Sequence, residues 1–153
     1  MGCGCGKDHK TGNCVCNVLK DIARAQRDIT ELECDTSCEK SISDLLGETE
    51  VRNGLDTVPV LLYCKDGCKP FKGFGAHPRN IGKMKSSFFF RVKSVSNDCC
   101  AVLELLRDPN DSDPNPHNPV EQHTKHLRTT GICITVDVKC FCDVTCLPAI
   151  SAF

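Results

Sequence analysis

The spacing of the apolar residues changes once along the chain, from a helical period to a strand period. Over residues 14–33 the apolar positions recur at alternating intervals of three and four, which predicts an amphipathic helix with a heptad-like seam. They are Val15, Val18, Ile22, Ala25, Ile29 and Leu32. Asn13 is a suitable N-cap. The seam is shorter than three heptads, so it favours a helix packed on its own domain. A helix at a subunit contact is the alternative.

A hydrophilic connector, residues 34–53, follows. Whether it forms a helical turn around Ile42 is left open. Beyond it the period becomes two, and residues 57–64 (TVPVLLYC) predict a strand. Pro59 cannot donate to a ladder, which places it at an edge or at the start of the strand. A turn and a return strand at 70–74 are expected next, then a Gly-, Pro- and Lys-rich loop.

Residues 87–106 predict a hairpin. Phe88, Phe90 and Val92 share one face of its first strand, and Ser-Asn-Asp supplies the turn. The following stretch, residues 108–119, holds four prolines among Asp and Asn and predicts an exposed loop.

The clearest alternation comes last, between residues 132 and 142. Ile132, Ile134, Val136 and Val138 share one face with Cys140 and Cys142, while Cys133 points the other way. This pattern predicts one half-buried strand with Cys140 and Cys142 directed to the core. Cys146 follows where the chain leaves the sheet.

Together these elements predict a mainly β protein with an N-terminal helix, folded as an antiparallel β-sandwich-like single domain. That domain spans residues 14–153 and contains the exposed loop 108–119. A flexible cysteine-rich arm, residues 1–13, precedes it. We find neither an internal repeat nor a second core.

The composition raises the central question, which is why the chain contains so many cysteines. The chain has 14 cysteines among 153 residues, the density of a disulfide scaffold. A domain of about 150 residues buries roughly 68–70% of its unfolded surface and folds without such cross-links. The sulfur is therefore expected to serve something other than stabilising one monomer.

Charge excludes some partners. The 19 basic and 20 acidic side chains form no block long enough to bind nucleic acid. A net charge near zero also removes the self-repulsion that keeps copies apart, which eases self-association.

The first residues, MGCGCGKDHKTGN, lack the apolar core of a secretory signal. No stretch approaches the length of a membrane span. Gly6 stands where N-myristoylation requires Ser or Thr. We therefore expect synthesis in a cytoplasm, where thiols stay reduced. Three explanations for the cysteines remain: a metal site, a reduced core, or a structure that meets oxidising conditions later.

The metal explanation predicts an intracellular cysteine-rich module for zinc or copper. The chain has no Cys-X-X-Cys, but its Cys-X-Cys pairs suit soft metals, and the best candidate group is Cys3, Cys5, His9, Cys14 and Cys16. A chelating protein needs little apolar core, whereas this one has seven phenylalanines. His117, His123 and His126 lack ligand spacing and are expected to be solvated. No thiolate–histidine signature is present, so we expect no enzyme and no cofactor.

Four segments carry a resemblance to a known family. They are GNCVCNVLKDIARAQ, DTVPVLLY, FFFRVKSVSNDCCAVLELLR and CITVDVKCFCDVTCL. In this order they resemble the cysteine-rich CotY, CotZ and ExsY family of spore coat and exosporium proteins. The resemblance runs over nearly the whole chain and is weakest at residues 40–55 and 108–126. The vicinal Cys99 and Cys100 and the C-terminal C-F-C-x3-C-L are the most specific parts.

The resemblance implies a structural protein that assembles with itself, and with other coat or exosporium proteins, on the spore surface. It implies hexameric rings joined into a two-dimensional lattice hardened by disulfides between subunits. It also implies synthesis in the mother-cell cytoplasm and oxidation when that cell lyses, which resolves the conflict over compartment.

The cysteines divide by expected role. The inter-subunit candidates, on the arm and helix start, are Cys3, Cys5, Cys14 and Cys16. Those within the domain or uncertain are Cys34, Cys38, Cys99, Cys100, Cys133, Cys140, Cys142 and Cys146. Cys99 and Cys100 are not expected to bond to each other, because the eight-membered ring would strain the peptide. Cys64 and Cys68 depart from the positions that the resemblance implies, so their role is left open.

Overall fold

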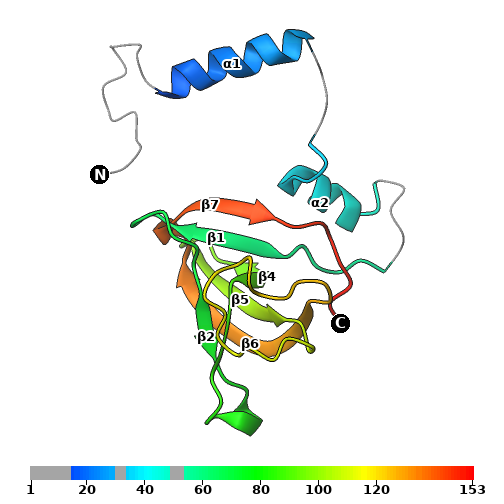
Figure 1. Ribbon diagram of the computed structural model, residues 1–153, viewed down its shortest axis with the longest axis vertical. Helices are drawn as coiled ribbons and strands as arrows, with labels where there is room; N and C mark the ends of the chain where they lie inside the picture. Colours follow the sequence, from blue (N-terminus) through cyan, green and yellow to red (C-terminus); the bar gives the residue numbers. More distant parts are fainter. Residues whose placement is uncertain (1–14, 30–33, 49–53) are drawn as a thin grey trace. The chain divides into compact units, whose positions relative to one another are not determined.

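The computed structural model describes residues 15–29, 34–48 and 54–153. The chain divides into two units, residues 1–35 and Thr36–Phe153 (Figure 1). Within the first, α1 spans Val15–Ile29 and confirms the predicted helix over those residues. None of its side chains is buried. The expected cap Asn13 and the end of the predicted helix at residues 30–33 lie outside the described residues.

The second unit begins with a short helix, α2, Cys38–Leu45, inside the segment expected to be a connector. Ser37 caps it, because the Ser37 hydroxyl accepts a hydrogen bond from the Lys40 N–H at 3.0 Å. Ser41 and Asp44 are its buried residues.

Five antiparallel strands form the main sheet, in the order β6-β5-β4-β1-β7. The mainly β fold class with an N-terminal helix is thereby confirmed. The predicted hairpin at 87–106 is confirmed as β4 and β5, which pair directly. The expectation that Phe88 shares a face with Phe90 is wrong, because Phe88 lies before β4 and packs with Phe89 in a different core from Phe90. The strands are β1 Val60–Cys64, β4 Phe89–Val95, β5 Cys100–Arg107, β6 Arg128–Asp137 and β7 Phe141–Cys146.

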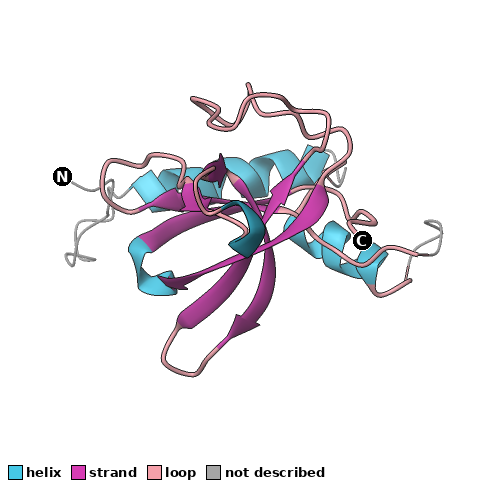
Figure 2. Ribbon diagram, turned by 90° about the horizontal axis from the view of Figure 1, so that it is seen from below, coloured by secondary structure: helices cyan, strands magenta, loops and turns pink. Residues whose placement is uncertain are grey.

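The main sheet is strongly curled (Figure 2). Its two edge strands, β6 and β7, are consecutive in the chain and are joined only by the 3-10 turn η2, Val138–Cys140. In a flat five-stranded sheet the edges lie about 19 Å apart, at roughly 4.8 Å per strand. The steps from Asp137 to Phe141 span at most about 14 Å. The sheet must therefore bend until its edges approach each other.

A second, two-stranded sheet covers one face of the first. It consists of β2, Gly73–Gly75, and β3, Lys85–Ser87, separated by the 3-10 turn η1, Pro78–Asn80. A Cβ on Gly73 would lie 2.8 Å from side-chain atoms of Ile134 and Phe90, and one on Gly75 would collide with Ile132. Glycine is thus required at both positions for the two sheets to pack closely.

The central strands of the sheet, β5, β4 and β1, contribute buried residues to two cores. Val60, Phe90 and Leu105 belong to one core, whereas their chain neighbours Leu61, Phe89 and Leu106 belong to the other. This arrangement explains why the strands contain short continuous apolar runs such as VLL and FFF rather than strict alternation.

The C-terminal segment closes the second core and is anchored by Asp56. Its carboxylate accepts hydrogen bonds from the Ala152 N–H at 2.9 Å and the Thr57 hydroxyl at 2.7 Å. Burial alone would raise the pKa of Asp56, but these bonds and the nearby Arg91 guanidinium hold that pKa below its ordinary value. Ala152 is buried in the core as a result.

The predicted loop at 108–119 contains no helix or strand, as expected. Its base is nevertheless buried. Asp108 accepts hydrogen bonds from the N–H groups of Asn110, at 2.9 Å, and His126, at 3.1 Å. The bond from Asn110 lowers the pKa of Asp108, burial raises it, and the contact with His126 lowers it further, so the pKa lies below its ordinary value.

Candidate cross-linking sites

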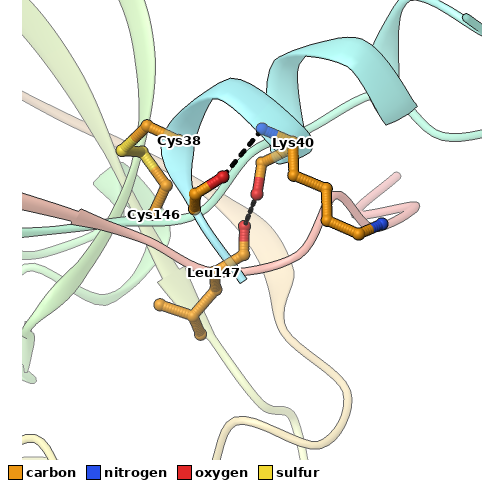
Figure 3. Close-up of a disulfide and its surroundings, with 6 residues drawn as sticks. Cys38, Lys40, Cys146 and Leu147 are labelled. Carbon is orange, nitrogen blue, oxygen red and sulfur yellow. Dashed lines mark hydrogen bonds between the residues drawn. A yellow bond between two sulfur atoms is a disulfide. The ribbon is translucent and has the colours of Figure 1, made fainter. Parts of the chain in front are cut away.

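One disulfide joins the two ends of the second unit. Cys38, the first residue of α2, bonds to Cys146, the last residue of β7, with a Cα–Cα distance of 4.9 Å (Figure 3). The Ser41 hydroxyl adds a hydrogen bond of 2.7 Å to the Leu147 carbonyl. The helix is therefore attached to the end of β7 both covalently and through a buried hydroxyl.

The remaining cysteines of the described residues carry free thiols, and most are exposed. Cys64 and Cys99 are half-buried. The exposed ones are Cys16, Cys34, Cys68, Cys100, Cys133, Cys140 and Cys142. Of the four N-terminal candidates, Cys16 is exposed on α1, while Cys3, Cys5 and Cys14 lie outside the described residues.

The prediction that Cys140 and Cys142 face the core is wrong, since both are exposed. The apolar alternation continues through residues 138–142, but the backbone does not remain one strand. β6 ends at Asp137, η2 turns the chain, and β7 begins in register with β1 rather than β5. The opposite placement of Cys133 is confirmed, because it is exposed while its neighbour Ile132 is buried.

Six free cysteines gather where the two edges of the curled sheet approach each other. We call this set, Cys64, Cys68, Cys99, Cys100, Cys140 and Cys142, the thiol corner. Its parts come from the β1 end, the turn after β1, the β4–β5 turn and the η2–β7 junction.

Backbone hydrogen bonds hold these parts of the thiol corner together. The Val138 N–H donates to the Cys99 carbonyl at 2.8 Å, and the Lys65 N–H donates to the Cys140 carbonyl at 2.8 Å. The Cys142 thiol lies 3.5 Å from the Cys64 carbonyl oxygen.

Two members of the thiol corner have unusual backbone conformations. Cys68 has φ 52° and Cys99 has φ 63°, both in the left-handed region. An L-residue with a Cβ pays about 1–2 kcal/mol there, and Gly or Asn is the usual occupant. Local conformation thus gives no reason for cysteine at either position.

A family model described as "Spore coat protein Z" matches residues 3–149. The chain is also 30% identical over 154 residues to spore coat protein Z of Bacillus subtilis (strain 168), covering 90% of each protein. The chain belongs to the spore coat protein Z family. No solved structure matches it.

Within the described part of this spore coat protein Z family member, no group of three or more His, Cys, Asp or Glu residues could hold a metal ion. Of the metal candidates, Cys3, Cys5, His9 and Cys14 lie outside that part. The loop residues His117, His123 and His126 are exposed, as expected. No helix among the described residues is long and apolar enough to cross a membrane.

Sequence reasoning missed two groupings in this family member. The Cys38–Cys146 bond joins residues 108 positions apart, and no local signal indicates such a pairing. The thiol corner depends on β7 pairing with β1, which brings Cys142 beside Cys64. The sequence did indicate two turns of the thiol corner, since Cys68 follows the turn residues Lys-Asp-Gly and Cys99 follows Ser-Asn-Asp.

Proposed function

We propose that this chain is a structural protein of the bacterial spore surface, in the coat or the exosporium. Copies of it assemble into a two-dimensional hexagonal lattice, which disulfides between subunits then harden. The observation that carries the proposal is the set of seven exposed free thiols among the described residues, in a chain whose second unit already has a disulfide of its own. Family membership supports the spore coat as the place.

A lattice needs contacts that close into rings and further contacts that join the rings. Each contact can be weak, because many act together and a neighbour already held in place has a high effective concentration. Disulfides then block dissociation until they are reduced. That kinetic effect adds more to an array than the equilibrium contribution of any single bond.

The proposed bridges include Cys3, Cys5, Cys14 and Cys16. Cys16 is exposed on α1, which supports its part in this role. Subunits and other coat or exosporium proteins are the partners, with hexameric rings as the repeating unit. Synthesis takes place in the mother-cell cytoplasm, where reduced thiols let the array assemble reversibly before oxidation fixes it. The role is structural and involves no catalysis.

Electron microscopy of the purified recombinant protein, with and without reductant, tests the lattice. Ordered sheets should form in both samples, and only sheets made without reductant should survive boiling in detergent. A variant with all four N-terminal cysteines replaced by serine should lose most of that resistance. A discrete monomer carrying stoichiometric zinc or copper, which unfolds on chelation, would contradict the proposal and favour a metal-binding module.

A further inference from the structure

We propose that the thiol corner of one copy is the acceptor for the N-terminal cysteines of a neighbouring copy. This inference rests on the proposed function and deepens it, because it names both surfaces of the covalent contact. The donor segment supplies Cys3, Cys5, Cys14 and Cys16. The acceptor surface supplies chiefly the four exposed members of the thiol corner, Cys68, Cys100, Cys140 and Cys142.

The thiol corner concentrates reactive groups in one place on the folded unit. Hydrogen bonds from Val138 to Cys99 and from Lys65 to Cys140 fix its segments against one another. The other free cysteine of the sheet, Cys133, sits in β6 opposite Glu104 of β5, which leaves it outside this hydrogen-bonded group. A partner that reaches the thiol corner therefore meets several thiols at once, whereas Cys133 offers one.

The symmetry of the contact decides which cysteines bond to the thiol corner. If the thiol corner bonded to the thiol corner of a second copy, the contact would be isologous, and its disulfides would link copies only in pairs, so that no covalent network would extend through the array. A bond between two different surfaces is heterologous, and such contacts build rings and open arrays. The N-terminal cysteines belong to the unit of residues 1–35, and the thiol corner belongs to Thr36–Phe153. Donor and acceptor thus belong to different parts of the chain, as a continuous covalent network requires.

The chemistry is thiol–disulfide exchange with a small-molecule disulfide as oxidant. A thiolate of the corner attacks one sulfur of that oxidant, its S–S bond breaks, and the first small thiolate leaves. The neighbour's N-terminal thiolate then attacks the protein sulfur of the mixed disulfide and expels the second small thiolate. The two protein thiols give up two electrons and two protons. The small disulfide accepts the electrons and ends as two thiols.

The test mixes reduced copies grown in ¹⁴N and ¹⁵N medium, assembles them, oxidises them with a small-molecule disulfide and digests them with trypsin. The donor peptide, residues 11–20, carries Cys14 and Cys16. The exposed corner thiols fall in other peptides, residues 66–72, 94–107 and 140–153, because trypsin does not cleave the bond between Lys69 and Pro70. Cys133 falls in its own peptide, residues 129–139. Mass spectrometry should find donor peptides linked to corner peptides in mixed-label form. The Cys38–Cys146 link should occur only in same-label form, which serves as an internal control.

A variant provides the second readout. Replacing Cys68, Cys100, Cys140 and Cys142 by serine should reduce disulfide-linked species on gels without reductant at least tenfold, while sheets still form. The control Cys133→Ser should cross-link like the wild type. Donor–corner links found only in same-label form, corner-to-corner links between copies, or a corner variant as cross-linked as the wild type would each overturn the inference while leaving the lattice intact. Absence of sheets from every protein would instead overturn the proposed function, and the inference with it.

Discussion

Removing the Cys38–Cys146 bond should cost the second unit a large share of its stability. The bond closes a loop between residues 108 positions apart. By the chain-entropy estimate, a loop of about 100 residues is worth about 4.7 kcal/mol, because the cross-link restricts the unfolded chain. That figure is an upper bound here. Without the bond, α2 is held through contacts such as that of Ser41 with Leu147. Any loosening of the helix raises the conformational entropy of the folded variant, and this offsets part of the lost stability.

The double variant Cys38→Ser/Cys146→Ser should therefore lose about 3–4.5 kcal/mol of unfolding free energy. At a urea dependence of about 2 kcal/mol per molar, the unfolding midpoint should fall by roughly 2 M. The chain has no tryptophan and one tyrosine, so far-ultraviolet circular dichroism is the suitable probe. Free thiols in both proteins should be blocked with iodoacetamide so that intermolecular disulfides do not form during unfolding.

Two further measurements make this prediction strict. Cys133→Ser, at an exposed thiol without a disulfide, should leave the midpoint unchanged within about 0.5 kcal/mol. Amide hydrogen exchange should accelerate in α2 of the double variant and stay slow in the buried strand β5. A loss below about 1 kcal/mol, with unchanged exchange in α2, would refute the reasoning, because the bond would then constrain neither the unfolded chain nor the helix.

Two other predictions concern packing and charge. Gly75→Ala should destabilise the protein by about 1–3 kcal/mol in urea unfolding, because the new methyl group collides with Ile132, whereas Gly82→Ala, with no atom within 4 Å of its Cβ, should cost less than about 0.5 kcal/mol. A cost for Gly75→Ala no greater than for Gly82→Ala would show that the two sheets are not in close contact. Asp108 has a lowered pKa, so its stabilisation is present above its unfolded pKa of about 3.9 and is lost as the pH falls through the lower folded value. Thermal unfolding between pH 2 and 7 should therefore show a shallower acid decline for Asp108→Asn than for the wild type, and an unchanged decline would contradict the assignment.

The hairpin at β4 and β5 was predictable because its signals are local. Alternating residues such as Phe88, Phe90 and Val92 lie close to a Ser-Asn-Asp turn in sequence. The break between β6 and β7 was not predictable in this way. Val138 and Cys140 continue the alternation through η2, and only the pairing of β7 with β1, distant in sequence, ends the first strand.

The helix α2 also could not be predicted from local signals in the sequence. Eight residues are too short for a reliable periodic signal. What stabilises the helix is tertiary, namely the bond from Cys38 to Cys146 and the contact of Ser41 with Leu147. The thiol corner was not predicted, because Cys140 and Cys142 were expected to face the core and Cys64 and Cys68 were left without a role. The grouping of these cysteines depends on the curl of the sheet.

The pairing of β1 with β7 also has a consequence for the order of events during synthesis. β1 emerges early, but one of its two partners is the last strand to be made. A nascent chain therefore carries its cysteines without the corner, since Cys64 and Cys142 meet only when β7 has docked. Such long-range pairing is slow to form. A cross-link that requires the assembled corner would select finished subunits and pass over incomplete ones.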